Sequence, residues 1–206
     1  MLFLVLITSV FSFKLTSQNI FKSGLLLGIT ASQYDGDGYA GYKKAGLTAG
    51  FYSRVKTGDH THLQLEISYF MKGARKIPDP NKNDLNQYLL DLDYVDIPLL
   101  FRMEFEKRHL LAELGSGIGI LVRVREENNY LDITGRRPFN RTEIPFHSGL
   151  GYYLSNGWEV ILRYSYSIIP VRPHPSGKSV WFNRGEFNNS LSFSVRKTFG
   201  KKAETI

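Results

Sequence analysis

The stretch GDGYAG, from Gly36 to Gly41, matches the G-x-G-x-x-G pattern with which many enzymes bind the pyrophosphate of a dinucleotide. That chemistry requires a buried strand before the glycines and a helix after them, because the helix N-terminus directs free N–H groups at the phosphates. The residues that follow, KKAGLTAGFYSRV, instead alternate like a strand. We therefore interpret the stretch as a surface turn, and the sequence predicts no cofactor.

The same loop carries Asp35 and Asp37 in a D-x-D-G sequence, and carboxylate oxygens are the ligands that Ca²⁺ prefers. An EF-hand also needs a third acid or amide and a glutamate at the twelfth position, where this chain has Gly46. We expect a flexible surface turn in which both carboxylates are available for loop contacts. A calcium site completed by other loops is the alternative.

Side chains suited to acid–base or nucleophilic catalysis are present, but they lack partners at catalytic spacing. Glu66 and Asp96 would act as a hydrolytic carboxylate pair only if a substrate reached them. Ser116 lies in a GSG sequence, without a G-x-S-x-G elbow or a partner base. The histidines show no metal-ligand spacing: His60, His62, His109, His147 and His174. We predict that the protein is not an enzyme.

The composition limits the remaining classes of function. With 206 residues, the chain is long enough for one domain of ordinary size. It contains no cysteine, which excludes disulfide frameworks, thiolate metal sites and cysteine nucleophiles together. The formal net charge of +7 is spread along the chain without a dense basic segment, so we expect no nucleic-acid partner.

The first residues differ from the rest. Leu2 to Phe13 form an apolar run that is too short to cross a bilayer as a helix, and the small or polar residues after it, before Gln18, resemble a signal-peptidase site. No basic side chain precedes the run, which departs from the usual pattern. We predict a cleavable signal peptide over residues 1–17 and one domain over residues 18–206. A buried N-terminal strand is the alternative.

Beyond residue 18, eight segments alternate apolar and polar residues with period two, which predicts strands with two different faces. Their apolar sets run from Phe21 to Ile29, Ala45 to Phe51, Leu63 to Met71, Val95 to Phe101, Leu110 to Ile120, Ile144 to Tyr152, Trp158 to Tyr166 and Leu191 to Phe199. No segment has the pattern of an amphipathic helix. The fold class is therefore all-β.

The links between these segments alternate in length. Short links near residues 58, 107 and 156 look like hairpin turns, and longer polar links lie near 32–43, 74–87, 124–140 and 171–186. Outer-membrane barrels combine short periplasmic turns with long outer loops. The sequence predicts an eight-stranded antiparallel up-and-down transmembrane β-barrel in the outer membrane of a Gram-negative bacterium, with both chain ends on the periplasmic side.

Alternation alone leaves two barrels open, because the apolar set either faces lipid or lines the pocket of a soluble, lipocalin-like periplasmic barrel. The polar set is rich in glycine beside long charged residues, which suits a narrow lumen. Aromatic residues near the ends of the apolar stripes fit an interfacial girdle: Phe21, Phe51, Phe101, Trp158 and Phe199. These features favour the membrane barrel.

The polar set would then fill the lumen. An eight-stranded barrel is just wide enough to be filled by side chains, and enclosed charges must pair or be hydrated because desolvation is costly. We expect a salt-bridged network and no wide diffusion pore. Its predicted members are Arg54, Glu66, Asp96, Arg102, Glu113, Arg123, Glu159, Arg163 and Arg196.

Four stretches give the chain a family resemblance: YDGDGYAGYKKAGLTAGF, LQLEISYFMKGA, YVDIPLLFR and LLAELGSGIGIL. The chain resembles the PorT-type outer-membrane β-barrels of Bacteroidetes over most of residues 19–199. The most specific stretch is YVDIPLLFR, because a proline cannot donate a hydrogen bond to the strand ladder. We expect Pro98 to mark a bulge or a local break in pairing, with Asp96 turned to the lumen.

The resemblance implies a small outer-membrane barrel, in some members needed for type IX protein secretion and gliding, and it transfers no catalytic residues. One function class is an accessory or interaction protein of an envelope assembly. The other is a receptor or adhesin whose loops bind lipopolysaccharide, glycans or host surfaces through basic residues. Those residues are Arg136, Arg137, Arg172, Lys178 and Arg184, and ordinary solvated loop charge is the alternative. Expected partners are outer-membrane lipid, lipopolysaccharide and secretion or envelope proteins.

Overall fold

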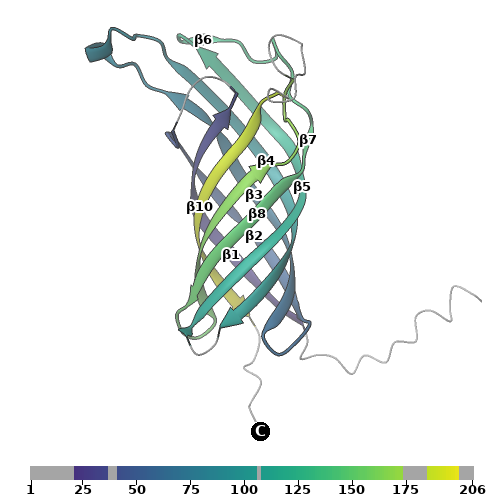
Figure 1. Ribbon diagram of the computed structural model, residues 1–206. Coiled ribbons are helices and arrows are strands. Elements are labelled where there is room, and N and C mark those ends of the chain that lie inside the picture. Colours follow the sequence, from purple (N-terminus) through teal and green to yellow (C-terminus); the bar gives the residue numbers. More distant parts are fainter. Residues whose placement is uncertain (1–20, 37–40, 106–107, 174–184, 200–206) are drawn as a thin grey trace, which may run out of the picture.

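The computed structural model describes residues 21–36, 41–105, 108–173 and 185–199, which form one tall barrel of tilted strands (Figure 1). The predicted signal peptide lies outside these residues and stays a prediction. The strands are β1 (Phe21–Asp35), β2 (Lys44–Lys56), β3 (Thr61–Lys76), β4 (Tyr88–Phe105), β5 (Leu110–Asn128), β6 (Leu131–Asp132), β7 (Thr142–Glu143), β8 (Pro145–Tyr153), β9 (Trp158–Ser167) and β10 (Phe187–Phe199), with a short 3-10 helix, η2 (Pro80–Lys82), between β3 and β4.

The strands close into a ring. Each long strand pairs antiparallel with two neighbours in the order β4-β3-β2-β1-β10-β9-β8-β5, and the pairing of β4 with β5 completes the circle. The two-residue strands β6 and β7 each pair with β5 only, so they are not counted among the eight strands of the ring. The predicted eight-stranded antiparallel up-and-down barrel is confirmed for the described residues.

The two faces of the wall have opposite chemistry. Outward-facing Leu27 and Leu150 are 64% and 69% exposed, whereas inward-facing Arg102 is fully buried. A soluble ligand-binding barrel has the reverse arrangement, with polar residues outside, so the lipocalin-like alternative is wrong. The predicted girdle residues, Phe21, Phe51, Phe101, Trp158 and Phe199, are all exposed on the outer face. No helix in the described part of the chain is long and apolar enough to span a bilayer.

Two irregularities mark strand β4. Its pairing with β3 is interrupted between Leu65↔Leu99 and Ser68↔Asp96 without a change of register, so Pro98 marks the local break that the sequence predicts. A true bulge lies elsewhere, where the register with β5 shifts between Asp93 and Tyr94. One residue of β5 is thereby left over, and every β5 side chain beyond the bulge changes face.

Three strands continue past the end of the ring. The β2–β3 pairing stops at Thr48↔Phe70, but the β3–β4 pairing continues to Lys76↔Tyr88. In Figure 1 this β3–β4 hairpin, together with the end of β5, rises above the barrel and leans away from its axis. The short turns lie at the opposite end, near the C-terminal strand end, which identifies the hairpin end as the extracellular one.

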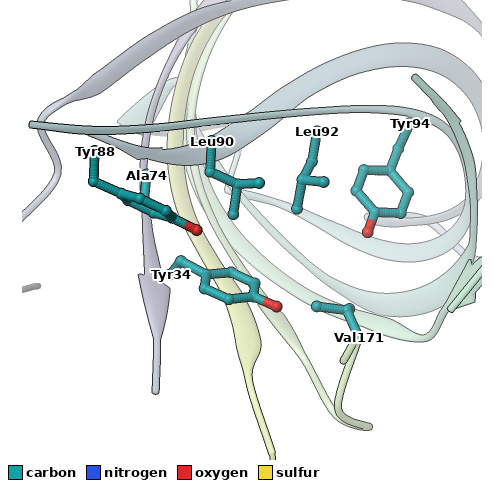
Figure 2. Packing of buried hydrophobic residues seen from close by; sticks show 7 residues of the cluster. All are labelled: Tyr34, Ala74, Tyr88, Leu90, Leu92, Tyr94 and Val171. Atoms are coloured by element: carbon teal, nitrogen blue, oxygen red, sulfur yellow. The ribbon is translucent and has the colours of Figure 1, made fainter. Parts of the chain in front are cut away.

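An apolar cluster lies inside the extracellular end of the barrel. Its members are Tyr34, Ala74, Tyr88, Leu90, Leu92, Tyr94 and Val171, which are buried and point toward one another (Figure 2). Val171 comes from the segment after β9, whereas the other six come from β1, β3 and β4. The cluster therefore joins the start of the β9–β10 link to the barrel wall.

Candidate functional site

The middle of the lumen is filled by arginines that each bind more than one carboxylate. Arg163 donates to both oxygens of Glu66 at 2.7 and 2.9 Å, and to Glu113 at 2.7 Å. Arg196 donates to Glu113 at 2.8 Å and lies 3.0 Å from Glu66. All four side chains are nearly or completely buried, so this group of residues leaves no open path through the barrel at its level.

A second group lies nearer the periplasmic end. Arg102 binds both oxygens of Glu159, and Arg54 donates to Glu159 at 3.3 Å. Arg54 also lies 3.6 Å from Glu104. Counting both groups, four arginines face four glutamates: Arg54, Arg102, Arg163 and Arg196 with Glu66, Glu104, Glu113 and Glu159. The charges balance, as burial in a narrow lumen requires.

Asp96 belongs to a different cluster, nearer the extracellular end. Lys72 lies 3.1 Å from Asp96 and donates a hydrogen bond to Glu143. Glu143 also accepts from Ser167 at 3.0 Å and from Asn188 at 2.5 Å. Glu143 is not among the predicted lumen residues, because the predicted strand begins one residue later, at Ile144. The alternation of the sequence does indicate it, because Glu143 and Pro145 lie four and two positions before His147, and every second residue here faces inward.

Arg123 lies outside the lumen, contrary to the sequence-based prediction. Its side chain is 56% exposed and its Nε donates to Asp93 Oδ2 at 2.5 Å on the outer face. The physical reason is the bulge at Asp93/Tyr94, which adds one β5 residue and inverts the faces from there on. If every second residue after Glu113 is taken to face inward, Arg123 is therefore assigned to the wrong face.

The extracellular mouth is closed by Arg172. It donates to both oxygens of Glu126, at 3.1 and 2.9 Å, and to Glu186. Tyr34 donates to Glu186 at 3.0 Å and Tyr88 to Glu126 at 2.7 Å, so the apolar cluster and this ion cluster share residues. The mouth is therefore closed both by apolar packing and by ion pairs. We call Arg172, Glu126 and Glu186 the mouth cluster.

This burial corrects the prediction that Arg172 is a free loop cation, because only 3% of the residue is exposed. Burial opposes ionisation of the guanidinium, but Tyr34, Glu186 and Glu126 outweigh it and raise the pKa of Arg172. Arg172 is therefore charged at any working pH and fully occupied by its two carboxylates.

The other predicted loop residues have separate environments. Arg137 donates to Glu186 at 3.1 Å, whereas Arg136 is exposed. Asp35 ends β1 and accepts hydrogen bonds from Gln33 and Asn189. The structure brings Arg137 to the mouth cluster and leaves Arg136 outside it. Asp37, Lys178 and Arg184 lie outside the described residues.

The residues considered for catalysis are used structurally. The GDGYAG stretch leads into strand β2 and not into a helix. Ser116 donates to the carbonyl of Pro145 at 2.9 Å, and His62 lies 3.3 Å from Glu104. His147 and Ser165 form a histidine–serine pair at 2.8 Å, but both side chains are buried between the lumen clusters, where a substrate has no access. Among the described residues, no group of three acidic or histidine side chains could hold a metal ion.

Comparison with known proteins agrees with this geometry. A family model described as an outer membrane protein beta-barrel domain matches residues 16–172. The search of curated proteins gives no match.

Two solved structures are similar to this chain. The crystal structure of Neisserial surface protein A is similar with 13% sequence identity and a TM-score of 0.50, covering 86% of this chain and 97% of that chain. The attachment invasion locus protein of Yersinia pestis is 12% identical with a TM-score of 0.48, covering 86% of this chain and 98% of that chain. At such identities the likeness concerns the fold alone.

Proposed function

The chain belongs to the family of outer membrane protein β-barrel domains and lies in the outer membrane of a Gram-negative bacterium, and from that premise we propose that it is a non-enzymatic accessory protein of the cell envelope. Its apolar wall anchors it in lipid. Its extracellular hairpins make the contacts with other envelope components. It neither conducts solutes nor turns over a substrate.

The observation that carries this proposal is the occupied lumen. A diffusion pore needs a continuous water path, but the Arg102–Glu159 pair, the Glu66–Glu113 group and the Arg172 cluster fill the lumen at three levels. An enzyme needs an accessible reactive group, and the charged groups of the lumen are paired and buried. The surfaces that remain for function are the outer wall and the extracellular hairpins.

We further propose a PorT-type role, in which the assembly served is the type IX secretion machinery. The stretches that support this are YVDIPLLFR, which forms the middle of β4, and LLAELGSGIGIL, which forms most of its partner β5. Both belong to the wall, so the resemblance concerns the barrel more than its loops. The receptor alternative has less support, because Arg137 and Arg172 already bind carboxylates.

The test combines assembly and partnership. The tagged protein is extracted from outer membranes in mild detergent, checked for heat-dependent migration on a semi-native gel, and purified to identify what accompanies it. We expect a folded barrel that brings down secretion components, and a loss of type IX cargo secretion when the gene is deleted. A folded barrel that purifies alone from a strain with normal secretion would overturn the proposal.

A loop variant separates the two function classes. Deletion of residues 126–138 would remove Glu126 and so break the contacts of Arg172 at the mouth. Arg136→Ala is cleaner, because Arg136 is exposed. If Arg136→Ala abolishes binding to lipopolysaccharide vesicles while secretion is unchanged, the receptor role replaces the accessory role.

A further inference from the structure

The turn between β5 and β6 holds a bulky residue where glycine belongs. Asn128 pairs with Leu131 across a two-residue turn in which Asn129 and Tyr130 have φ angles of 48° and 64°. Turns with two positive φ angles favour Asn-Gly, because a side chain at the second position is strained. The backbone at Tyr130 is therefore strained. Its side chain is 77% exposed, so packing within the barrel offsets little of that cost.

The same hairpin carries a second unfavourable feature. Glu127 and Asp132 are directly opposite each other on β5 and β6, and like charges in that position destabilise a strand pair. Arg125 offsets Glu127 at 2.5 Å. Asp132 accepts the backbone N–H of Thr134 at 2.8 Å, and the hydrogen bonds from Thr134 lower the pKa of Asp132. The hairpin therefore presents an acidic flank beside its exposed aromatic residue.

Further apolar side chains are exposed at this extracellular end. Leu131 is 67% exposed, and Leu85 and Ile77, at the neighbouring β3–β4 hairpin, are 69% and 55% exposed. The two hairpins are held together because Asn129 N–H donates to Gln87 O at 2.9 Å, and Gln87 N–H donates to Asn129 Oδ1 at 3.0 Å. We call Ile77, Leu85, Tyr130 and Leu131 the apical patch. All four are exposed and so are not buried in the lumen.

We propose that the apical patch is the docking surface for a neighbouring integral outer-membrane protein, which receives Tyr130 and Leu131 in an apolar pocket bordered by a basic side chain. This inference rests on the proposed accessory function and names the surface that it uses. A partner of that chemistry relieves both local costs at once, since it buries the strained ring and adds a second cation to the Glu127–Asp132 pair, which Arg125 compensates only in part.

Two observations select this partner. Two carboxylates, Glu127 and Asp132, face one cation, Arg125, so the flank keeps a net negative charge that disfavours the phosphates of lipopolysaccharide and favours a protein surface with a basic side chain. The β3–β4 hairpin, whose connecting segment contains Ile77 and Leu85, leans away from the barrel axis (Figure 1), toward the side on which a neighbouring membrane protein would lie. A soluble ligand approaching from above would not require that projection.

The experiment uses the full-length protein in living cells. A photo-crosslinking amino acid replaces Leu131 in the apical patch or, as the control, Leu154 in the short turn between β8 and β9 at the opposite end. We expect an adduct with one integral outer-membrane protein from position 131 and none from position 154. The adduct is identified by mass spectrometry and by reciprocal capture through a tag on that protein.

Tyr130→Gly then provides the decisive variant. Glycine relaxes the turn, so folding is unchanged or improved, whereas loss of the anchoring ring lowers the adduct yield from position 131 by about tenfold or more. Asp132→Lys is the second variant, and it lowers the yield by placing a cation against the basic border of the pocket.

Each outcome is informative. An adduct with lipopolysaccharide or with a second copy of this chain overturns the proposed partner. A protein adduct whose yield Tyr130→Gly leaves unchanged overturns the apical patch but leaves the accessory function standing. If the solubilised wild-type barrel also purifies without any partner, the accessory function itself fails.

Discussion

Arg102 on β4 donates two hydrogen bonds of 2.9 Å to the two carboxylate oxygens of Glu159 on β9. These strands are not neighbours in the ring, since β4 pairs with β3 and β5, and β9 pairs with β8 and β10. The pair therefore crosses the lumen and ties opposite walls together. Both side chains are at most 1% exposed.

Removing one member of this pair should destabilise the barrel strongly. Arg102→Ala leaves Glu159 buried with only its contacts to Arg54 and Arg196, and breaking a buried pair typically costs about 3–5 kcal/mol. The measurement is the free energy of unfolding in urea, with the protein folded into lipid vesicles.

Two controls show that the cost arises from the uncompensated charge. The double variant Arg102→Met with Glu159→Met should recover much of the loss, because it removes one charge of each sign and Arg54 keeps Glu104 as a neighbour. Lys56→Ala, which removes a pair exposed to solvent with a Lys56–Asp59 distance of 3.8 Å, should cost less than about 1 kcal/mol. Equal losses in Arg102→Ala and Lys56→Ala would contradict the cross-lumen role.

The wild-type barrel should show no stable ion conductance in a planar bilayer. The lumen contains the charge-balanced arginine–glutamate groups and, beyond them, the Lys72 cluster, so ions lack a hydrated path. Arg172→Ala alone should also stay closed, since it opens only the mouth. Steady single-channel currents from the wild type would rule out the occupied lumen in the membrane.

Arg172→Ala should loosen the start of the β9–β10 link. Without the guanidinium, Glu126 and Glu186 repel each other and the hydrogen bond from Val171 N–H to Glu186 O at 2.8 Å loses its support. Amide hydrogen exchange of Val171 should accelerate while exchange in the β1–β2 pairing stays slow. Arg136→Ala is the matched control, because Arg136 is exposed and should leave this exchange unchanged.

Gly117 should not tolerate a side chain. A Cβ atom there would lie 2.4 Å from the carbonyl oxygen of Ile97 and 2.5 Å from Cα of Pro98, so the β4 backbone would have to move. We expect Gly117→Ala to lower the free energy of unfolding by about 1–3 kcal/mol. Ile118→Val, one residue further on the lipid-facing side, should change it by less than about 1.5 kcal/mol. Similar values for the two variants would contradict the close approach.

The barrel and its two faces follow from local sequence. Alternation in segments such as Leu63 to Met71 requires a two-faced strand, because successive side chains point to opposite sides of a sheet. The regular change between short and long links then indicates an up-and-down barrel. Seven of the nine side chains proposed for the lumen meet there in one network: Arg54, Glu66, Arg102, Glu113, Glu159, Arg163 and Arg196.

Sequence periodicity could not settle the remaining positions, because they depend on contacts between distant strands. The bulge opposite Asp93 inverts one stretch of β5 and moves Arg123 outside, and a bulge has no signature in the alternation of one strand. The stagger between strands across the lumen determines that Asp96 meets Lys72 and Glu143 and not the arginines. The sequence alone indicates that Arg172 is a cation of an exposed loop. Folding of the β9–β10 link places it between Glu126 and Glu186, which are 46 and 14 residues away. The face of each strand is a local property with period two, whereas the partner of each charge exists only once the ring has closed.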